Sequence, residues 1–347
     1  MRPRIDLHLV RENLRQLDET TYFSEKLHTF TKKLIGAIDH VLAVPSRYSD
    51  DVVRVFADVA RISQTYLAGS TTKEAPYEME YCLRAAIPRW TGRETLITTA
   101  LTSGQDFHLL PIDPWNFVAT AVSGYQVGAY SPLLVLIGVP RIYRHKPIYC
   151  IPLYHELGHF IDETLGVIRY SLFVNPPPPG YDHEVVQSHR QEFFADLFAA
   201  CYCGHASIRT LQTIAPHNPA TPTHPATADR ARVVEEFLGG IQNDIVDHFQ
   251  SCLAALGAPN LMPLYSLPSI AQSYDDMRPF TLTSREHLHG IFESSWNYLS
   301  ETLDGRPSSW AIPSLSDGDI ERVVNDLTEK SIRNMSIKER WDSGITP

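Results

Sequence analysis

The chain has 347 residues, 43% of them hydrophobic, which is enough to bury one large core or two modest ones. Its 30 basic and 40 acidic residues give a formal net charge of −10, so we do not expect a nucleic-acid-binding protein. The five cysteines show no disulfide pattern and the first residues form no apolar signal-peptide core, and both features predict a cytoplasmic protein.

The N-terminal part of the chain is predicted to be helical. Apolar residues recur at spacings of three and four in residues 11–17, 24–41 and 50–67, which is typical of amphipathic helices. Pro45 separates the second of these helices from the third. We therefore expect a helical region over residues 1–92, which forms either a hydrophobic core or a surface for a regulatory partner.

Short β-prone segments separated by glycine and proline come next. We expect a small mixed sheet, and its candidate strands are residues 96–100, 117–122, 133–139 and 148–151. A helix follows, because Pro152 suits its first turn and Gly166 suits its end.

The segment from His155 to His159 has the sequence HELGH, the HExxH pattern, within this predicted helix. Residues four apart lie on one face of a helix, so both imidazoles can bind the same zinc ion. Glu156 lies next to His155, close enough to take a proton from a metal-bound water, which is the role of the general base in a zinc peptidase. The pentapeptide also arises by chance, so the sequence around it must show whether it forms a metal site.

Two carboxylates lie four residues apart in a second predicted helix, residues 189–201, whose other side chains are mostly apolar. An unpaired buried charge is costly, and a zinc ion would explain both acids. Glu192 would be the third ligand, and Asp196 would accept a hydrogen bond from the non-ligating nitrogen of a zinc-bound histidine. In the alternative interpretation, both acids are solvated. His183 and His189 are alternative ligands, although a catalytic site with three protein ligands keeps one position open for water.

The two predicted metal-binding helices are joined by residues 174–183, which contain four consecutive prolines. These prolines predict a stiff, extended arm. The arm either walls the cleft, with Tyr181 or His183 reaching the substrate, or serves as a rigid connector.

A third motif, Thr-His-Pro at residues 223–225 followed by Arg230, completes a series with the first two. In this order the three motifs resemble those of the gluzincin zinc metallopeptidases, specifically the CAAX prenyl protease and HtpX type, over residues 150–235. The resemblance implies that His224 stabilises the oxyanion and that Arg230 supports that corner of the site. It also implies that Glu156 is the general base and that each chain binds one zinc ion through His155, His159 and Glu192.

In that family a small sheet precedes the active-site helix, and its edge strand pairs with the extended substrate. Residues 133–139 are the candidate for such an edge strand. The family members are membrane proteins, whereas the longest apolar stretch here, residues 132–140, is far shorter than the ~20 residues of a membrane-spanning helix. We therefore expect no membrane partner and no prenylated substrate.

These expectations combine into a mostly α-helical α+β protein in three parts. A helical region (1–92) precedes a zinc metallopeptidase core (93–257) with a small mixed sheet and two metal-binding helices, and a helical region (258–347) follows. The predicted function is regulated intracellular hydrolysis of a protein or peptide substrate, as an endopeptidase rather than an exopeptidase. The alternatives are a catalytically silent gluzincin-fold binding or regulatory protein, and a zinc hydrolase of a non-peptide amide or ester.

Overall fold

The computed structural model describes residues 3–22, 24–71, 77–104, 106–110, 114–122, 125, 133–312, 314–342 and 344. The chain divides into two compact units, residues 1–80 with 92–144 and residues 81–91 with 145–347. Helix is the dominant structure in both, and the predicted fold class, a mostly α-helical α+β protein, is confirmed. The division at residues 92 and 257 stays a prediction.

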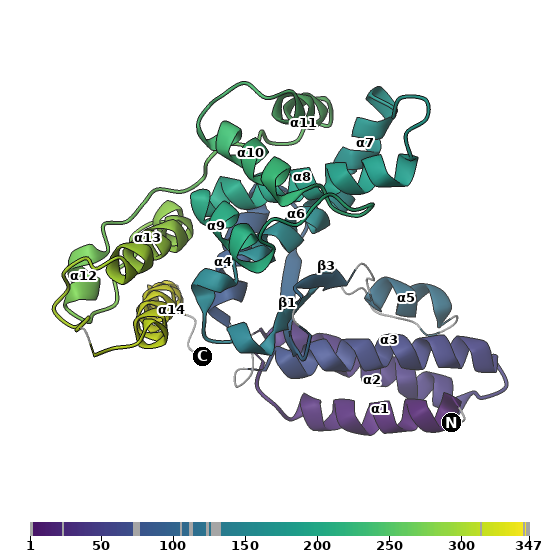
Figure 1. The fold of residues 1–347 in the computed structure, drawn as a ribbon. Coiled ribbons are helices and arrows are strands. Elements are labelled where there is room, and N and C mark those ends of the chain that lie inside the picture. The colour runs from purple at the N-terminus through teal and green to yellow at the C-terminus, as the bar shows by residue number, and fades with distance from the viewer. Residues whose placement is uncertain are drawn as a thin grey trace. The chain divides into compact units, whose positions relative to one another are not determined.

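The first unit is built on a layer of three helices that lie side by side (Figure 1). They are α1 (Pro3–Asp18), α2 (Glu25–Ala43) and α3 (Asp50–Gly69), and they confirm the predicted N-terminal helices. Ser24 and Ser49 begin α2 and α3, since their side chains accept hydrogen bonds from the free backbone N–H groups of Lys26 and Val52.

A small mixed sheet belongs to the same unit. Its strands are β1 (Thr95–Thr102), β2 (His108–Leu110) and β3 (Leu133–Pro140), in the order β1-β3-β2. Strand β1 runs parallel to β3 and pairs with it from Thr95–Leu133 to Thr102–Pro140, whereas β2 is antiparallel to β3. Helix α3 packs against β1, and the hydrophobic core lies between the helices and the sheet.

Three sequence predictions for this region are wrong. Strand β3 is central and not an edge strand, in keeping with its continuous apolar sequence, which is typical of a strand buried on both faces. Residues 117–122 lie largely in a helix, α5 (Pro114–Ala121). Residues 148–151 include the end of a 3-10 turn (Pro147–Tyr149) and form no strand. Two further 3-10 turns span Ile87–Arg89 and Arg141–Tyr143.

The second unit is helical throughout its described elements. It contains the later part of α4 (Tyr77–Ala86), followed along the chain by α6 (Pro152–Leu165), α7 (Val167–Val174), α8 (His183–Cys203), α9 (His205–Ile214), α10 (Thr227–Leu238), α11 (Asp244–Ala255), α12 (Ala271–Asp275), α13 (Arg285–Leu303) and α14 (Asp317–Asp342). Helix α6 packs along α8, and α9 and α10 pack against α8 as well (Figure 1).

Residues 230–256 have the sequence pattern of one long helix, weakly interrupted at Gly239 and Gly240, and the structure divides them into two helices at this point. The helix breaks between α10 and α11, because Gly240 adopts a left-handed conformation (φ 66°) and Asn243 caps α11.

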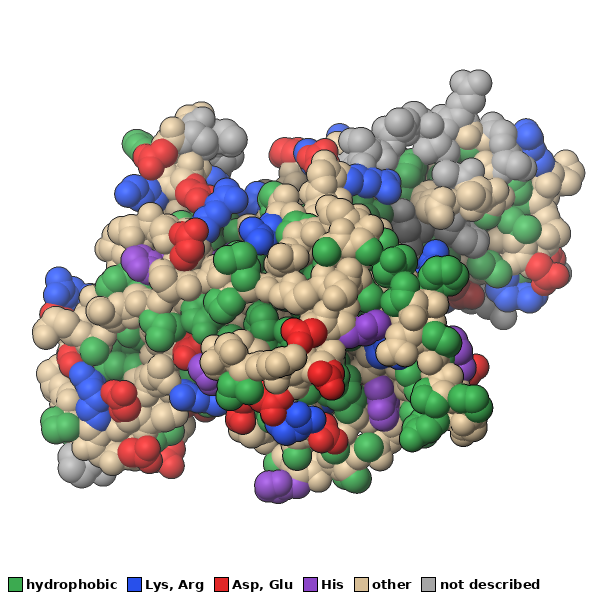
Figure 2. Space-filling model, turned by 90° about the horizontal axis from the view of Figure 1, so that it is seen from above, with side chains coloured by type: hydrophobic (Ala, Val, Ile, Leu, Met, Phe, Trp, Pro, Cys, Tyr) green, Lys and Arg blue, Asp and Glu red, His purple; other side chains and the backbone are tan. Residues whose placement is uncertain are grey.

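On the face of the molecule shown in Figure 2, acidic and basic side chains are interspersed among apolar ones. Among the described residues, no helix has both the length and the apolar character needed to cross a lipid bilayer.

Candidate metal centre

Helix α6 carries the HELGH segment, and its ends lie where the sequence predicts them. Pro152 occupies the first turn, and Gly166 ends the helix in a left-handed conformation (φ 72°), with its N–H donating to the carbonyl of Asp162. The Asp162 carboxylate then accepts a hydrogen bond from the N–H of Ile168 at 2.7 Å, which fixes the turn into α7.

Helix α8 carries the two acids that the sequence analysis singled out. Asp182 caps its first turn, earlier than the predicted start at residue 189. From Phe194 to Cys203 every residue is buried, so this half of the helix is surrounded by protein on all sides. Glu192 and Asp196 lie at the start of this part and are themselves 8% and 7% exposed, so neither is a solvated surface acid.

A backbone contact at Gly158 sets the spacing between α6 and α8. A Cβ atom at this position would lie 2.8 Å from Cα of Ala195 and 3.1 Å from Cβ of Phe198. Only glycine therefore allows the helices to approach this closely. Gly158 lies between His155 and His159, and Ala195 lies between Glu192 and Asp196, so the contact places the two pairs of side chains opposite each other.

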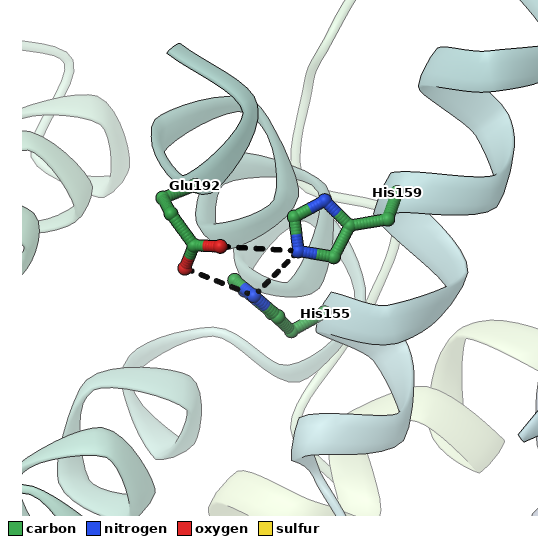
Figure 3. A group of neighbouring side chains, drawn as sticks. All are labelled: His155, His159 and Glu192. Carbon is green, nitrogen blue, oxygen red and sulfur yellow. Dashed lines mark hydrogen bonds and ion pairs between the residues drawn. The ribbon is translucent and has the colours of Figure 1, made fainter. Parts of the chain in front are cut away.

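Three side chains converge at this crossing, as Figure 3 shows. Nε2 of His155 lies 3.0 Å from Nε2 of His159, and the Glu192 carboxylate lies 3.4 Å from each of these nitrogens. One donor atom from each residue falls within 4.8 Å of the other two. The group could hold a metal ion, and its two imidazoles and one carboxylate are ligands that suit a divalent transition metal.

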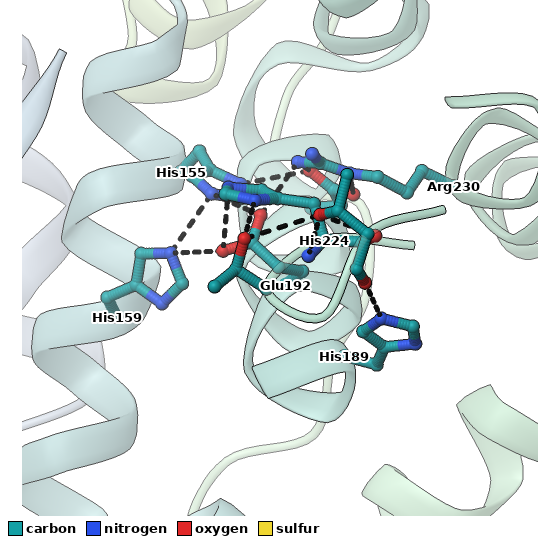
Figure 4. A network of polar contacts seen from close by, with 9 residues as sticks. His155, His159, His189, Glu192, His224 and Arg230 are labelled. Atoms are coloured by element: carbon teal, nitrogen blue, oxygen red, sulfur yellow. Dashed lines mark hydrogen bonds and ion pairs between the residues drawn. The ribbon is translucent and has the colours of Figure 1, made fainter. Parts of the chain in front are cut away.

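Asp196 and Arg230 support the three candidate ligands, and Figure 4 shows Arg230 next to them. Asp196 accepts a hydrogen bond from His155 Nδ1 at 2.9 Å, which directs Nε2 of that ring toward His159 and Glu192. Arg230, from the first turn of α10, donates to both oxygens of Asp196, at 2.6 Å and 2.7 Å. This bidentate ion pair is buried, and it holds the carboxylate in the orientation that His155 needs.

The charges of these groups shift one another's pKa values. Burial lowers the pKa of His155, but the carboxylates of Glu192 and Asp196 outweigh burial and raise it to about 10. Burial raises the pKa of both acids, and the cationic partners outweigh it, so that both pKa values fall below their usual range. The acids are therefore ionised, as metal ligation and its support require.

One oxygen of Glu192 suits a bound cation. Its Oε2 is buried and has no hydrogen-bond partner within the described parts of the chain. The nearest cation, Nη2 of Arg230, forms an ion pair with it at 3.2 Å. A buried carboxylate oxygen without a hydrogen bond is unusual, and a bound cation beside His155 would satisfy it.

His224 reaches the cluster from the loop before α10. Its Nε2 lies 3.7 Å from Oε1 of Glu192, and its side chain is 55% exposed. Local bonds shape the loop: the N–H of Thr221 donates to the His224 carbonyl, and Oγ1 of Thr223 lies 2.9 Å from Nδ1 of His224. Thr223 thereby turns the ring so that Nε2 faces Glu192.

The structure does not bring the alternative ligands to the cluster. Nε2 of His189 donates to the carbonyl of Thr221 at 2.7 Å, so its ring points at the loop (Figure 4). His183 is exposed at the start of α8, and Tyr181 in the proline arm is 69% exposed. In the described structure neither of these two side chains contacts the three candidate ligands.

Glu156 is half-buried on α6 beside His155. Its carboxylate has no hydrogen-bond or ion-pair partner among the residues that the structure describes. Sequence reasoning assigned no role to two residues of this site, Gly158 and Thr223, although both lie within the motifs. A glycine inside a helix is a signal for Gly158, because glycine there costs about 1 kcal/mol unless packing requires it. Thr223 precedes His224 in the third motif, but no local pattern indicates that it orients the ring.

Comparisons with known protein families, characterised proteins and solved structures found no match to this chain. The resemblance to the gluzincin metallopeptidases therefore rests on the three sequence motifs. The structure adds that the motifs, which are far apart in sequence, meet at one place: His155 and His159 from α6, Glu192 from α8, and His224 from the loop before α10.

Proposed function

We propose that this protein is a zinc-dependent metallopeptidase of the gluzincin type, acting on a protein or peptide substrate. The observation that carries the proposal is the convergence of His155, His159 and Glu192 around a buried carboxylate oxygen without a hydrogen bond. A structural site alone does not explain Glu156, which lies beside the cluster and has no partner in the described structure. Two imidazoles and one carboxylate with an adjacent glutamate are the donor set of a catalytic zinc site.

Each residue then has a defined part in the proposed hydrolysis. His155, His159 and Glu192 would hold the zinc ion, which when bound acidifies water and polarises a carbonyl group. Glu156 takes the proton from the attacking water and delivers it to the leaving nitrogen of the peptide bond.

His224 supplies a hydrogen bond to the oxyanion that develops on the carbonyl oxygen. Loss of one such donor typically lowers the rate by about 10²–10³. Asp196 and Arg230 act through His155, because they fix its tautomer and the direction of its ring.

The test combines metal analysis with cleavage mapping. The purified full chain should contain about one zinc ion, and incubation with a denatured cell proteome should generate new peptide termini. Glu156→Gln should keep the zinc and the fold and lose the cleavage, because it removes only the base. Glu163→Gln, a matched change at an exposed position of the same helix, should keep both.

Other outcomes would contradict this function or favour one of the alternatives. Near-normal cleavage by Glu156→Gln would show that Glu156 is not the base, and the proposed mechanism would be wrong. No cleavage by the zinc-loaded wild type would favour the silent binding protein, and turnover of model esters or amides without new peptide termini would favour the non-peptide hydrolase.

A further inference from the structure

A hollow of about 340 Å³ lies in the second unit and shares no lining residue with the candidate metal centre. The end of α4 and the turn after it, the segment before α12, the end of α8 and the first turns of α13 enclose it. Its volume is at the lower end of the range for small-molecule sites. Its wall is both polar and aromatic.

Two arginines line this hollow, Arg89 after α4 and Arg285 at the start of α13. Both are exposed, and within the described residues neither guanidinium has a hydrogen bond or an ion pair. Arg285 occupies the first helical position, where the helix dipole disfavours a cation. Two unpaired guanidinium groups beside a helix N-terminus form a strongly anion-attracting wall.

A buried histidine provides a polar atom deeper in the same wall. His289 is 3% exposed and lines the hollow, and its Nδ1 is bonded to the hydroxyl of Tyr154 at 2.8 Å. Its other ring nitrogen, Nε2, has no hydrogen-bond partner in the described parts of the chain. This nitrogen is not among the fully buried atoms that lack a partner, so it is accessible, and a ligand in the hollow would give it a hydrogen bond.

Aromatic rings form much of the remaining wall. The Tyr202 hydroxyl is already satisfied, since it accepts from Nε1 of Trp90 at 2.7 Å and donates to the Ala86 carbonyl at 3.1 Å. Tyr202 therefore offers its ring to the hollow, and Tyr265 lies in the same wall. The ligand should thus have an apolar, flat part as well as a charged one.

One acid, Glu286, also lines the hollow. Hydrogen bonds from its own backbone N–H and from the nearby Ser284 lower the pKa of its carboxyl group, so it is ionised. Two arginines, one carboxylate and the positive end of α13 still give the wall a net positive charge. In a chain of net charge −10, this local excess is notable.

We propose that this hollow is a second ligand site, which binds a small organic anion. A carboxylate or phosphate group would bond to Arg89 and Arg285, and the flat apolar part would lie against Tyr202 and Tyr265. Arginine suits both anions, because its planar fork matches their oxygen atoms.

Isothermal titration of the full-length protein at low salt tests the proposal with three probes: benzoate, phenyl phosphate and inorganic phosphate. We expect benzoate or phenyl phosphate to bind the wild type, and the one that binds more tightly identifies the anionic group. Arg89→Gln and Arg285→Gln should each weaken that binding about tenfold or more, because each removes a charged hydrogen bond. Both positions are exposed, so these variants should fold normally.

Arg169→Gln, at an exposed position on α7, is the matched control and should bind like the wild type. The proposal is overturned if neither organic probe binds at millimolar concentration, or if the double variant Arg89→Gln with Arg285→Gln binds as well as the wild type. Equal affinity for inorganic phosphate and phenyl phosphate, with no binding of benzoate, would also overturn it, because the apolar part would then contribute nothing.

Discussion

Replacing Gly158 by alanine should weaken metal binding more than it weakens the fold. The new Cβ would lie 2.8 Å from Cα of Ala195, whereas ordinary contact begins at 3.4 Å, so α6 and α8 would have to part by 3.4 − 2.8 = 0.6 Å to restore ordinary contact. Two of the candidate ligands lie on α6 and the third, Glu192, lies on α8. Metal–ligand distances tolerate only about 0.2 Å, so the affinity for zinc should fall about tenfold or more.

The expected loss of fold stability is smaller. Overpacking costs about 1–3 kcal/mol, and the better helix propensity of alanine returns about 1 kcal/mol. The free energy of unfolding, measured with urea in the presence of a chelator, should therefore fall by about 0–2 kcal/mol. Zinc affinity is measured separately, by competition with a chromophoric chelator.

Gly318→Ala is the matched control for this substitution. Gly318 is exposed in α14, and a Cβ there would meet only Oγ of Ser316, at 3.8 Å. This variant should keep the wild-type zinc affinity and gain up to about 1 kcal/mol of stability. If Gly158→Ala bound zinc within twofold of the wild type, the close approach of the helices would not control the ligand spacing.

Three further substitutions test the site and its support. Asp196→Asn should lower zinc affinity about 10–100-fold in the same competition assay, and an unchanged affinity would show that Asp196 does not orient His155. His224→Ala should lower kcat for peptide cleavage about 10²-fold at unchanged zinc content, and normal turnover would remove His224 from the mechanism. Burial raises the pKa of Asp162 to about 6 from an ordinary 3.8, so its contribution to stability is complete below pH 3.8 and is lost as the pH rises through 6. The wild type should therefore lose about 1–2 kcal/mol more than Asp162→Asn between pH 5 and pH 8, and parallel urea-unfolding curves would contradict this.

Local signals in the sequence predicted the bounds of α6, which carries two of the candidate ligands. Proline and glycine act within one or two residues of a helix end, so Pro152 and Gly166 mark α6 without knowledge of the rest of the fold. The α5 helix shows the opposite case. Its residues are β-prone, but Trp115, Val118 and Val122 are buried at helical spacing, and this packing outweighs intrinsic preference.

The candidate site was predictable to a similar extent. Spacing within one helix paired His155 with His159, and the apolar neighbours of Glu192 and Asp196 indicated that these acids are buried. The approach of Arg230 to Asp196 depends on how the loop before α10 brings that helix back to α8, and no local sequence pattern encodes this. It followed only from the resemblance of the third motif to a known family.

The ion pair of Arg230 with Asp196 determines the net charge of the candidate metal centre. Glu192 and Asp196 contribute −2 and Arg230 contributes +1, so the buried group carries −1 when both histidines are neutral. With a pKa of about 10, His155 takes up one proton near neutral pH and brings this sum to zero. A divalent cation must displace that proton, so loading should release about one proton and tighten as the pH rises. The loaded group then carries −1 + 2 = +1, a charge that a single monoanion neutralises. If the proposed zinc site is loaded in this way, small monoanionic chelating groups, such as hydroxamates, should bind to it.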